Sequence, residues 1–508
     1  MRKMEAKAYT SEDLAIKPED DLFQEKLDFD VFKGKPHSIS AVRLTFFRNH
    51  PSSDDINQLT NDDILGYAII VRLKDASSSE APLDDFTYIF EAVVRPPGIY
   101  LNESFQSIPN QYIHCFRNFE TVVGVEGSEK SFTFPGTFFC QQNLKTHVCG
   151  HAAVRMALNT IPGFPKVTNK ELNDAFAFDH RNTLVPPQIE LDALVQFIES
   201  KGFSVDSIDF CANPNLDQEE AIYPLIESGF PVLLAIGNNQ QAHIFTIVGH
   251  TLNSDRVPLP KVNYPGKTGY ISASEWTDHY ICNDDSTGMY IAVSADRLRT
   301  TIVPKFNADL HVAAALGILP RDVRLPGSVA DELSRRFFYI MGEYWKDPSD
   351  AWLSVIGYDH NRWKDLLFED PSNVVFRTLL CTRTEYSAHV REHLGAFYGC
   401  ELLMNLPERF WVTELSLPDL FATNKRKLGD VIIRCDEPEN EDASSHMILA
   451  WTPQLTSIWR PHEFFREKIE AYHKGLPVDT RILHVSNLFD GHIPILRSGC
   501  CYERFLEW

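Results

Sequence analysis

Runs of β-branched and aromatic residues dominate the first part of the sequence. The segments 41–47, 66–73 and 86–94 are rich in Val, Ile, Phe and Tyr, a composition typical of strands. The polar segment 74–85 predicts a loop or hairpin connection between the last two, and a Pro-Pro-Gly sequence ends the third run. We therefore expect residues 1–130 to form a β-rich N-terminal domain.

The pattern changes in the central part of the chain. Small and apolar residues fill the segment 149–158, which predicts a short helix buried against a sheet. Thr168 and Glu171 have the spacing of a capping box, and apolar residues on one side of 187–200 predict a further helix. Apolar runs predict strands at 232–236, 243–248, 280–283 and 289–293. Helices followed by strands indicate an α+β domain, which we expect over residues 131–305.

The remaining residues, 306–508, are expected to form an α/β C-terminal domain. The segment 319–329 contains two prolines and a glycine, as a connector would, and 330–345 has a helical pattern. Strands are predicted at 374–381, 431–435 and 447–451. Three domains suit a chain of 508 residues, because single hydrophobic cores stop growing at roughly 250–300 residues.

Charge and cysteine usage narrow the functional classes. The 48 basic and 70 acidic side chains give a formal net charge of -22, which disfavours general binding to nucleic acids and to anionic membranes. The ten cysteines are widely spaced, unlike a disulfide framework, and the first residues lack the apolar stretch of a signal peptide. No segment has the apolar length that crosses a bilayer. We therefore expect a cytoplasmic protein, with its oligomeric state left open.

A candidate nucleophile lies in the sequence FFCQQNLKTHVCGHAAVRMAL, residues 138–158. It places Cys149 at the N-terminus of a predicted helix, where the helix dipole favours the thiolate form that acts as a nucleophile. Gly150 keeps bulk away from an incoming carbonyl, and a glutamine amide, from Gln141 or Gln142, can stabilise an oxyanion together with the Cys149 backbone N–H. Of the ten cysteines, this is the one for which we expect help from both a helix dipole and an imidazole.

A candidate base and its orienting carboxylate follow later in the chain. In NNQQAHIFTIVGH, His243 begins an apolar strand that ends near Gly249. In TDHYICNDDSTGMYI, a strand delivers Asp284 and Asp285 into a turn closed by Gly288. An imidazole can take the thiol proton, and a carboxylate can orient the ring. Because side chains alternate along a strand, we expect only one of the two aspartates to face the imidazole.

These motifs, in this order, resemble the papain-like cysteine peptidases, and most closely the bacteriocin-leader-peptidase-like group. The resemblance covers the central third of the chain. It implies a papain-like domain with Cys149 as nucleophile, His243 as base, Asp284 as orienting carboxylate and Gln142 as oxyanion donor. The implied reaction is hydrolysis of a peptide or isopeptide bond in a protein or peptide substrate, without a cofactor or metal.

Two departures from the family pattern keep alternatives open. Gln142 lies one position farther from the nucleophile than is usual, so the choice between Gln141 and Gln142 is not made by the sequence. Asp285 stands where the family usually has proline, so the choice between Asp284 and Asp285 is also open. Acyl transfer or deamidation on the same residues, or a non-catalytic interaction module, are the alternative functions.

A first rival interpretation is a metal site around the candidate nucleophile. His147, Cys149 and His151 alternate, with Cys140 nearby. The Gly and Ala residues that follow Cys149 favour a helix, however, and structural zinc prefers paired ligand motifs. We therefore prefer the nucleophile interpretation.

A second rival is the sequence HVREH, which matches an inverted zinc-peptidase motif. Its His389 and His393 would share one face of a helix, with Glu463 or Glu467 as a distant third ligand. We interpret the match instead as the polar face of a helix over 384–403, because five residues recur easily by chance in a chain of this length.

Overall fold

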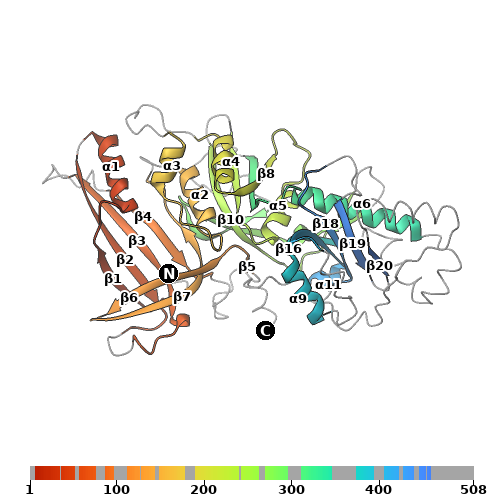
Figure 1. The fold of residues 1–508 in the computed structure, drawn as a ribbon, viewed down its shortest axis with the longest axis horizontal. Coiled ribbons are helices and arrows are strands. Elements are labelled where there is room, and N and C mark those ends of the chain that lie inside the picture. The colour runs from red at the N-terminus through yellow and green to blue at the C-terminus, as the bar shows by residue number, and fades with distance from the viewer. Residues whose placement is uncertain are drawn as a thin grey trace.

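The described strands form three sheets that follow one another along the long axis of the protein (Figure 1). The arrangement comes from a computed structural model. The residues that it describes are 6–34, 36–51, 56–75, 86–96, 111–125, 127–143, 148–177, 189–238, 242–253, 255–262, 269–295, 311–345, 373–393, 406–422, 427–439, 446–452 and 455–458.

The N-terminal sheet has six antiparallel strands in the order β1-β2-β3-β4-β7-β6. Their bounds are Ala8–Leu14 (β1), His37–Phe47 (β2), Ile64–Asp75 (β3), Phe86–Val94 (β4), Arg117–Val125 (β6) and Ser128–Phe139 (β7). Phe29 of helix α1 (Asp21–Lys33) packs with Val71 and Tyr88 on one face. The three strands predicted in this region lie within β2, β3 and β4, which confirms that prediction.

The central sheet has the order β14-β13-β10-β9-β15-β8, with β5 paired to the end of β10. Its strands are β5 (Gln111–Ile113), β8 (Phe203–Asp209), β9 (Val232–Gly237), β10 (Ala242–Thr251), β13 (His279–Asp284), β14 (Gly288–Ser294) and β15 (His311–Pro320). Side chains alternate between its faces, because Leu233 and Ile244 pack with one set of helices while Leu234 and Phe245 pack with another.

Helices cover both faces of the central sheet. One set comprises α2 (Cys149–Leu158), α3 (Asn169–Ala175) and α4 (Leu191–Ser200), and α5 (Gln218–Glu227) packs on the other face. The predicted cap at Thr168 is confirmed, because its side chain accepts a hydrogen bond from the backbone N–H of Glu171 at 3.2 Å. Among the helices in the described part of the chain, none combines the length and apolar character that crossing a bilayer requires.

The C-terminal sheet has the order β11-β12-β16-β17-β18-β19-β20. Its strands are Lys261–Val262 (β11), Gly269–Ser272 (β12), Val375–Thr382 (β16), Arg409–Ser416 (β17), Gly429–Arg434 (β18), Met447–Thr452 (β19) and Leu455–Ile458 (β20). Helices α6 (Gly327–Trp345), α9 (Arg383–His393) and α11 (Pro418–Ala422) accompany it. Strand β12 runs parallel to β16, and the other neighbours are antiparallel.

Helices and strands are mixed throughout, which confirms the α+β class. Several strands differ from the sequence division. Residue 130 falls inside β7, β5 precedes it but joins the central sheet, and β11 precedes residue 305 but joins the C-terminal sheet. Strand β15 begins beyond residue 305 but joins the central sheet between β8 and β9, and β12 precedes that residue but joins the C-terminal sheet. Local patterns do not specify partners that lie far apart in sequence. The three-domain division with boundaries at 130 and 305 stays a prediction.

Candidate active site

The N-terminus of α2 holds the candidate nucleophile. Cys149 is its first residue and is partly exposed, whereas every following residue of the helix is buried. Val148 precedes it in an extended conformation, so the chain enters the helix at a sharp change of direction. The thiol is therefore an accessible group at the positive end of an otherwise buried helix.

Small side chains let α2 lie close to its neighbours. Thr246 of β10 donates a hydrogen bond to the carbonyl oxygen of Ala153 at 3.1 Å, which joins the helix to the sheet. A Cβ on Gly150 would lie 3.2 Å from Cδ1 of Ile189. The expected reason for this glycine was room for a substrate carbonyl, and the structure supplies a different one: Gly150 packs against Ile189 and Leu194 at the start of α4.

His243 and Asp284 come together from neighbouring strands. His243 lies at the start of β10 and Asp284 at the end of β13, which pairs with β10 in antiparallel register. The distance from His243 Nε2 to Asp284 Oδ1 is 3.1 Å, and both side chains are buried. The backbone N–H of Ser286 donates to Asp284 Oδ1 at 2.8 Å, and the Thr287 hydroxyl donates to Asp284 Oδ2 at 2.7 Å. The Asp284 carboxylate is thus itself held in place.

The Cys149 side chain also interacts with the His243 ring. Burial by itself lowers the pKa of the His243 imidazole, but the hydrogen bond with Asp284 and the interaction with Cys149 outweigh burial and raise the pKa to about 10. Burial by itself raises the pKa of the Asp284 carboxyl, but its hydrogen bonds with His243, Thr287 and Ser286 lower the pKa below its ordinary value. Near neutral pH the imidazole is therefore protonated and Asp284 is ionised.

Asp285 lies beside the same imidazole, which the alternation argument did not anticipate. Its Oδ1 is 3.8 Å from His243 Nε2 and accepts a hydrogen bond from the Ser286 hydroxyl at 3.3 Å. Asp284 ends the strand and Asp285 belongs to the turn, so the alternation of a strand no longer applies between them. Burial raises the pKa of the Asp285 carboxyl to about 7, attraction to His243 opposes this shift, and repulsion by Asp284 adds to it.

The two candidate glutamines point in different directions. Gln141 is held by the N-terminal sheet, because its backbone N–H donates to the carbonyl oxygen of Ile89 and its side-chain oxygen accepts from the Ile89 N–H. The Gln142 amide instead donates to the Ser286 hydroxyl at 3.4 Å, in the turn after Asp284. This arrangement favours Gln142 as the residue nearer the candidate site.

The N-terminal sheet and α1 support the candidate nucleophile helix through buried contacts that the sequence did not reveal. Arg155 of α2 is fully buried, lies over the rings of Phe90 and Phe138, and donates to Asn169 at 3.0 Å. Glu25 of α1 accepts a hydrogen bond from the same Asn169 side chain at 3.0 Å. The sequence did carry one signal of these contacts. Arg155 stands in a helix of small and apolar residues, and a buried arginine needs polar partners.

A second thiol, that of Cys211, also lies near an imidazole, although Cys211 does not begin a helix. Cys211, at the end of β8, is exposed, and its sulfur lies 3.8 Å from His311 Nε2. The other described cysteines are buried. Cys211 lies in a turn and not at a helix N-terminus, so it lacks the dipole contribution.

The rival metal interpretations fall partly outside the described residues. Cys140 is buried and its thiol donates to the Ala152 carbonyl oxygen, while His151 Nδ1 accepts a hydrogen bond from the Val148 N–H at 3.3 Å. His147 lies outside the described residues. These contacts leave Cys140 and His151 engaged with the local backbone.

In the second rival motif, His389 lies on α9 and is buried. The side chain of His393, and all of Glu463 and Glu467, lie outside the described residues. The expected helix over 384–403 is described only as far as residue 393.

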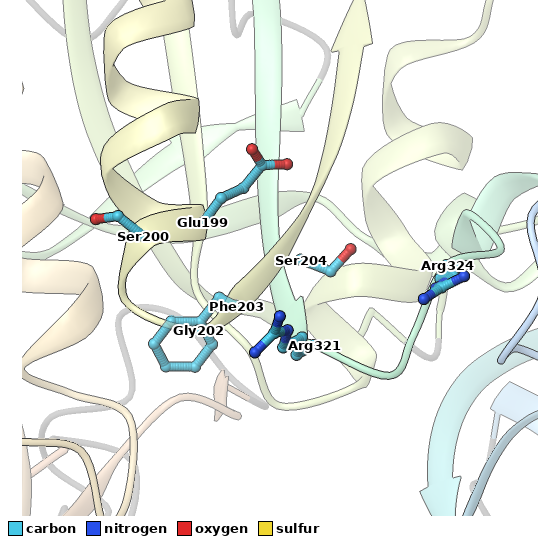
Figure 2. A pocket seen from close by; sticks show the side chains of 7 residues that line it. All are labelled: Glu199, Ser200, Gly202, Phe203, Ser204, Arg321 and Arg324. Carbon is cyan, nitrogen blue, oxygen red and sulfur yellow. The ribbon is translucent and has the colours of Figure 1, made fainter.

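An open cavity of about 430 Å³ lies elsewhere, at the C-terminal end of α4 (Figure 2). Arg321 and Arg324, which follow β15, line it together with Phe203 and Glu199. Gly150 packs near the opposite end of the same helix, so this cavity is separate from the candidate site. Its lining mixes both signs of charge and indicates no single ligand class.

Comparison with known proteins found no match to this chain among protein-family models, curated proteins or solved structures.

Proposed function

We propose that the protein is a cysteine hydrolase of papain-like type that cleaves a peptide or isopeptide bond. Cys149 is the nucleophile, His243 the general base and acid, Asp284 the orienting carboxylate and Gln142 the oxyanion donor. One observation carries the proposal: the His243 ring interacts both with Cys149 and, at 3.1 Å, with Asp284, a carboxylate with hydrogen-bonded oxygens.

The chemistry follows from the charge state of these groups. A thiolate at the N-terminus of α2 attacks the acyl carbon and forms a carbon–sulfur bond, while the carbonyl electrons move to oxygen. His243 gives its proton to the leaving nitrogen as the carbon–nitrogen bond breaks. Water then attacks the thioester, His243 takes its proton, and release of the acid returns the Cys149 thiolate with protonated His243.

The substrate class follows from chemistry and charge. We propose a protein or peptide substrate in the cytoplasm, because the reaction needs a reduced thiol and an acyl group carried by an amide. The net charge of -22 disfavours nucleic acid and anionic membrane surfaces as general partners. Neither a cofactor nor a metal takes part in the proposed reaction.

The test compares three forms of the full chain on proteome-derived peptides and on native lysate. Wild type should create new peptide termini that Cys149→Ala does not, and Cys211→Ala should behave as wild type, since it removes an exposed thiol outside the site. Mass gains at amines without new termini would point to acyl transfer, and loss of side-chain amides would point to deamidation. Identical results for wild type and Cys149→Ala in every readout would refute an enzymatic role and favour an interaction module.

A further inference from the structure

One face of the candidate site gathers three groups that can each give an electron pair to a cation. They are His243 Nε2, a carboxylate oxygen of Asp284 and a carboxylate oxygen of Asp285, and these three atoms all lie within 4.8 Å of one another. All three side chains are buried. One imidazole with two carboxylates is a ligand set that zinc accepts.

The spacing of these atoms suits a tetrahedral ion. With metal–ligand bonds of about 2.0–2.1 Å and tetrahedral angles, neighbouring ligand atoms stand roughly 3.3 Å apart. The observed separations from His243 Nε2 are 3.1 Å to Asp284 Oδ1 and 3.8 Å to Asp285 Oδ1, on either side of that value; the other Asp285 oxygen, Oδ2, belongs to the same carboxylate. Small side-chain movements would therefore bring the three atoms to a common ion.

An oxygen without a partner is the independent sign of a ligand. Asp285 Oδ2 is buried and, among the described residues, accepts no hydrogen bond. The exposed fraction of the Asp285 side chain is 1%. Buried carboxylate oxygens without a partner are costly, so such an atom calls for an explanation, and an ion is one.

The neighbouring groups hold the ligands as metal sites require. Hydrogen bonds from the Ser286 N–H and the Thr287 hydroxyl orient Asp284. An ion that binds here displaces the His243 proton and leaves both carboxylates ionised, so the three ligands then carry a charge of minus two. Among the described residues, His243 is the basic side chain within ion-pair distance of either carboxylate. A divalent ion would balance this charge.

A second cluster of possible ligands lacks this uncompensated negative charge. His114, Glu227 and His250 also place their ligand atoms within 4.8 Å of one another. There, however, Arg377 already forms an ion pair with Glu227 at 2.7 Å, so its guanidinium balances the negative charge that a cation would otherwise balance. A cation has less to gain in that cluster.

We propose that His243, Asp284 and Asp285 bind a divalent cation of the zinc class, and that this ion reversibly inhibits the proposed hydrolase. The ion takes the place of the proton on His243 Nε2. A ring ligated there holds one proton fewer and cannot be the imidazolium that protonates the leaving nitrogen. The inhibitory half rests on the proposed function, and the binding half does not.

The first test measures binding without any activity. Chelator-stripped full chain is titrated with zinc chloride by calorimetry and equilibrium dialysis. Asp285→Asn keeps the shape of the side chain and should weaken the zinc site about tenfold or more, and His243→Gln should do the same. Cys149→Ala and His311→Ala should keep it, because neither removes a proposed ligand. Circular dichroism of each variant guards against loss of folding.

Cobalt(II) gives a second readout on the same proteins. Nitrogen and oxygen ligands should give d–d absorption without a thiolate-to-metal charge-transfer band, and the absorption should be lost in His243→Gln. Zinc binding unchanged in Asp285→Asn, zinc binding lost in Cys149→Ala, or a thiolate charge-transfer band would each overturn the assignment.

The inhibition test follows if new termini have been found with wild type. Zinc should suppress their formation, a chelator should restore it, and the zinc concentration for half suppression should rise about tenfold in Asp285→Asn. Bound zinc without suppression would overturn the inhibitory half alone. Because binding is measured separately, zinc binding in a protein without activity would leave this site standing while the proposed function fails.

Discussion

Two buried clusters of charge differ in how completely their members are paired. Between the central and C-terminal sheets, Arg377 binds Glu227 at 2.7 Å and Glu414 at 2.6 Å. Lys427 continues the series by binding Glu414 at 3.0 Å and Asp430 at 2.8 Å. In this network, which lies wholly in buried side chains, each acid has a base and each base has an acid.

The candidate active site is less complete. Two adjacent carboxylates, Asp284 and Asp285, share one imidazole, and one oxygen of Asp285 accepts no hydrogen bond from a described residue. A protein that needed only stability would pair these groups or replace them with apolar side chains. We therefore propose that the paired network serves the fold, whereas the incomplete cluster serves chemistry or ligand binding.

The largest effect is expected from breaking the paired network. Arg377→Met leaves Glu227 and Glu414 buried without their shared cation, which should lower the free energy of unfolding by about 3–5 kcal/mol. Arg409→Met is the matched control, because Arg409 forms a partly exposed pair with Asp322 and should cost less than about 1 kcal/mol. Urea unfolding measures both. Equal losses would remove the distinction between structural and surface pairs.

The next effect concerns turnover and not stability. Asp284→Ala removes the carboxylate 3.1 Å from His243 Nε2 and should slow formation of new termini by about 100-fold or more. Asp285→Ala should slow it by less than about tenfold, since that carboxylate lies 3.8 Å away. Turnover of the two variants, normalised to folded protein, decides between them. Reversed severities would assign the orienting role to Asp285.

A smaller effect is expected at Asp206, a buried carboxylate that belongs to neither of the two clusters. Burial raises the pKa of Asp206 to about 6, opposed by the hydrogen bond that its Oδ2 accepts from the Gly327 N–H. A carboxyl whose pKa is raised on folding stabilises the protein below its unfolded pKa of 3.8, and that contribution is lost as pH rises through about 6.

Asp206→Asn keeps an acceptor for Gly327 and removes the buried charge. It should therefore raise the free energy of unfolding at pH 8 by on the order of 2 kcal/mol, and the gain should shrink toward zero near pH 4. Urea unfolding at the two pH values measures this difference. A gain of the same size at both would show that the titration of this carboxyl is not the cause.

The sequence indicated local structure well where the signal was local. The strand runs of the N-terminal sheet, the helix after Cys149 and the cap at Thr168 were predicted from composition and spacing, and the structure contains them. Pairing between distant segments was not predictable in this way. The placement of β15 in the central sheet depends on contacts with β8 and β9, which no local pattern records.

The candidate site shows the same limit. The motifs named Cys149, His243 and Asp284, and these side chains lie together, although their catalytic role stays a proposal. Alternation along a strand excluded a second aspartate beside the imidazole and was wrong, because the strand ends between Asp284 and Asp285. The unpaired oxygen of Asp285 depends on the packing of the turn and has no signature in sequence.

In the proposed reaction, Cys149 is a thiol activated by both a helix N-terminus and His243. Limited iodoacetamide labelling of the folded protein at mildly acidic pH, read by mass spectrometry, tests this directly. Cys211 is the internal control, since it is more exposed and has His311 at 3.8 Å but no helix dipole. We predict that Cys149 is labelled before Cys211, and that this preference is lost in His243→Gln. Labelling of Cys211 or another cysteine first, with Cys149 inert in the folded protein, would contradict the account.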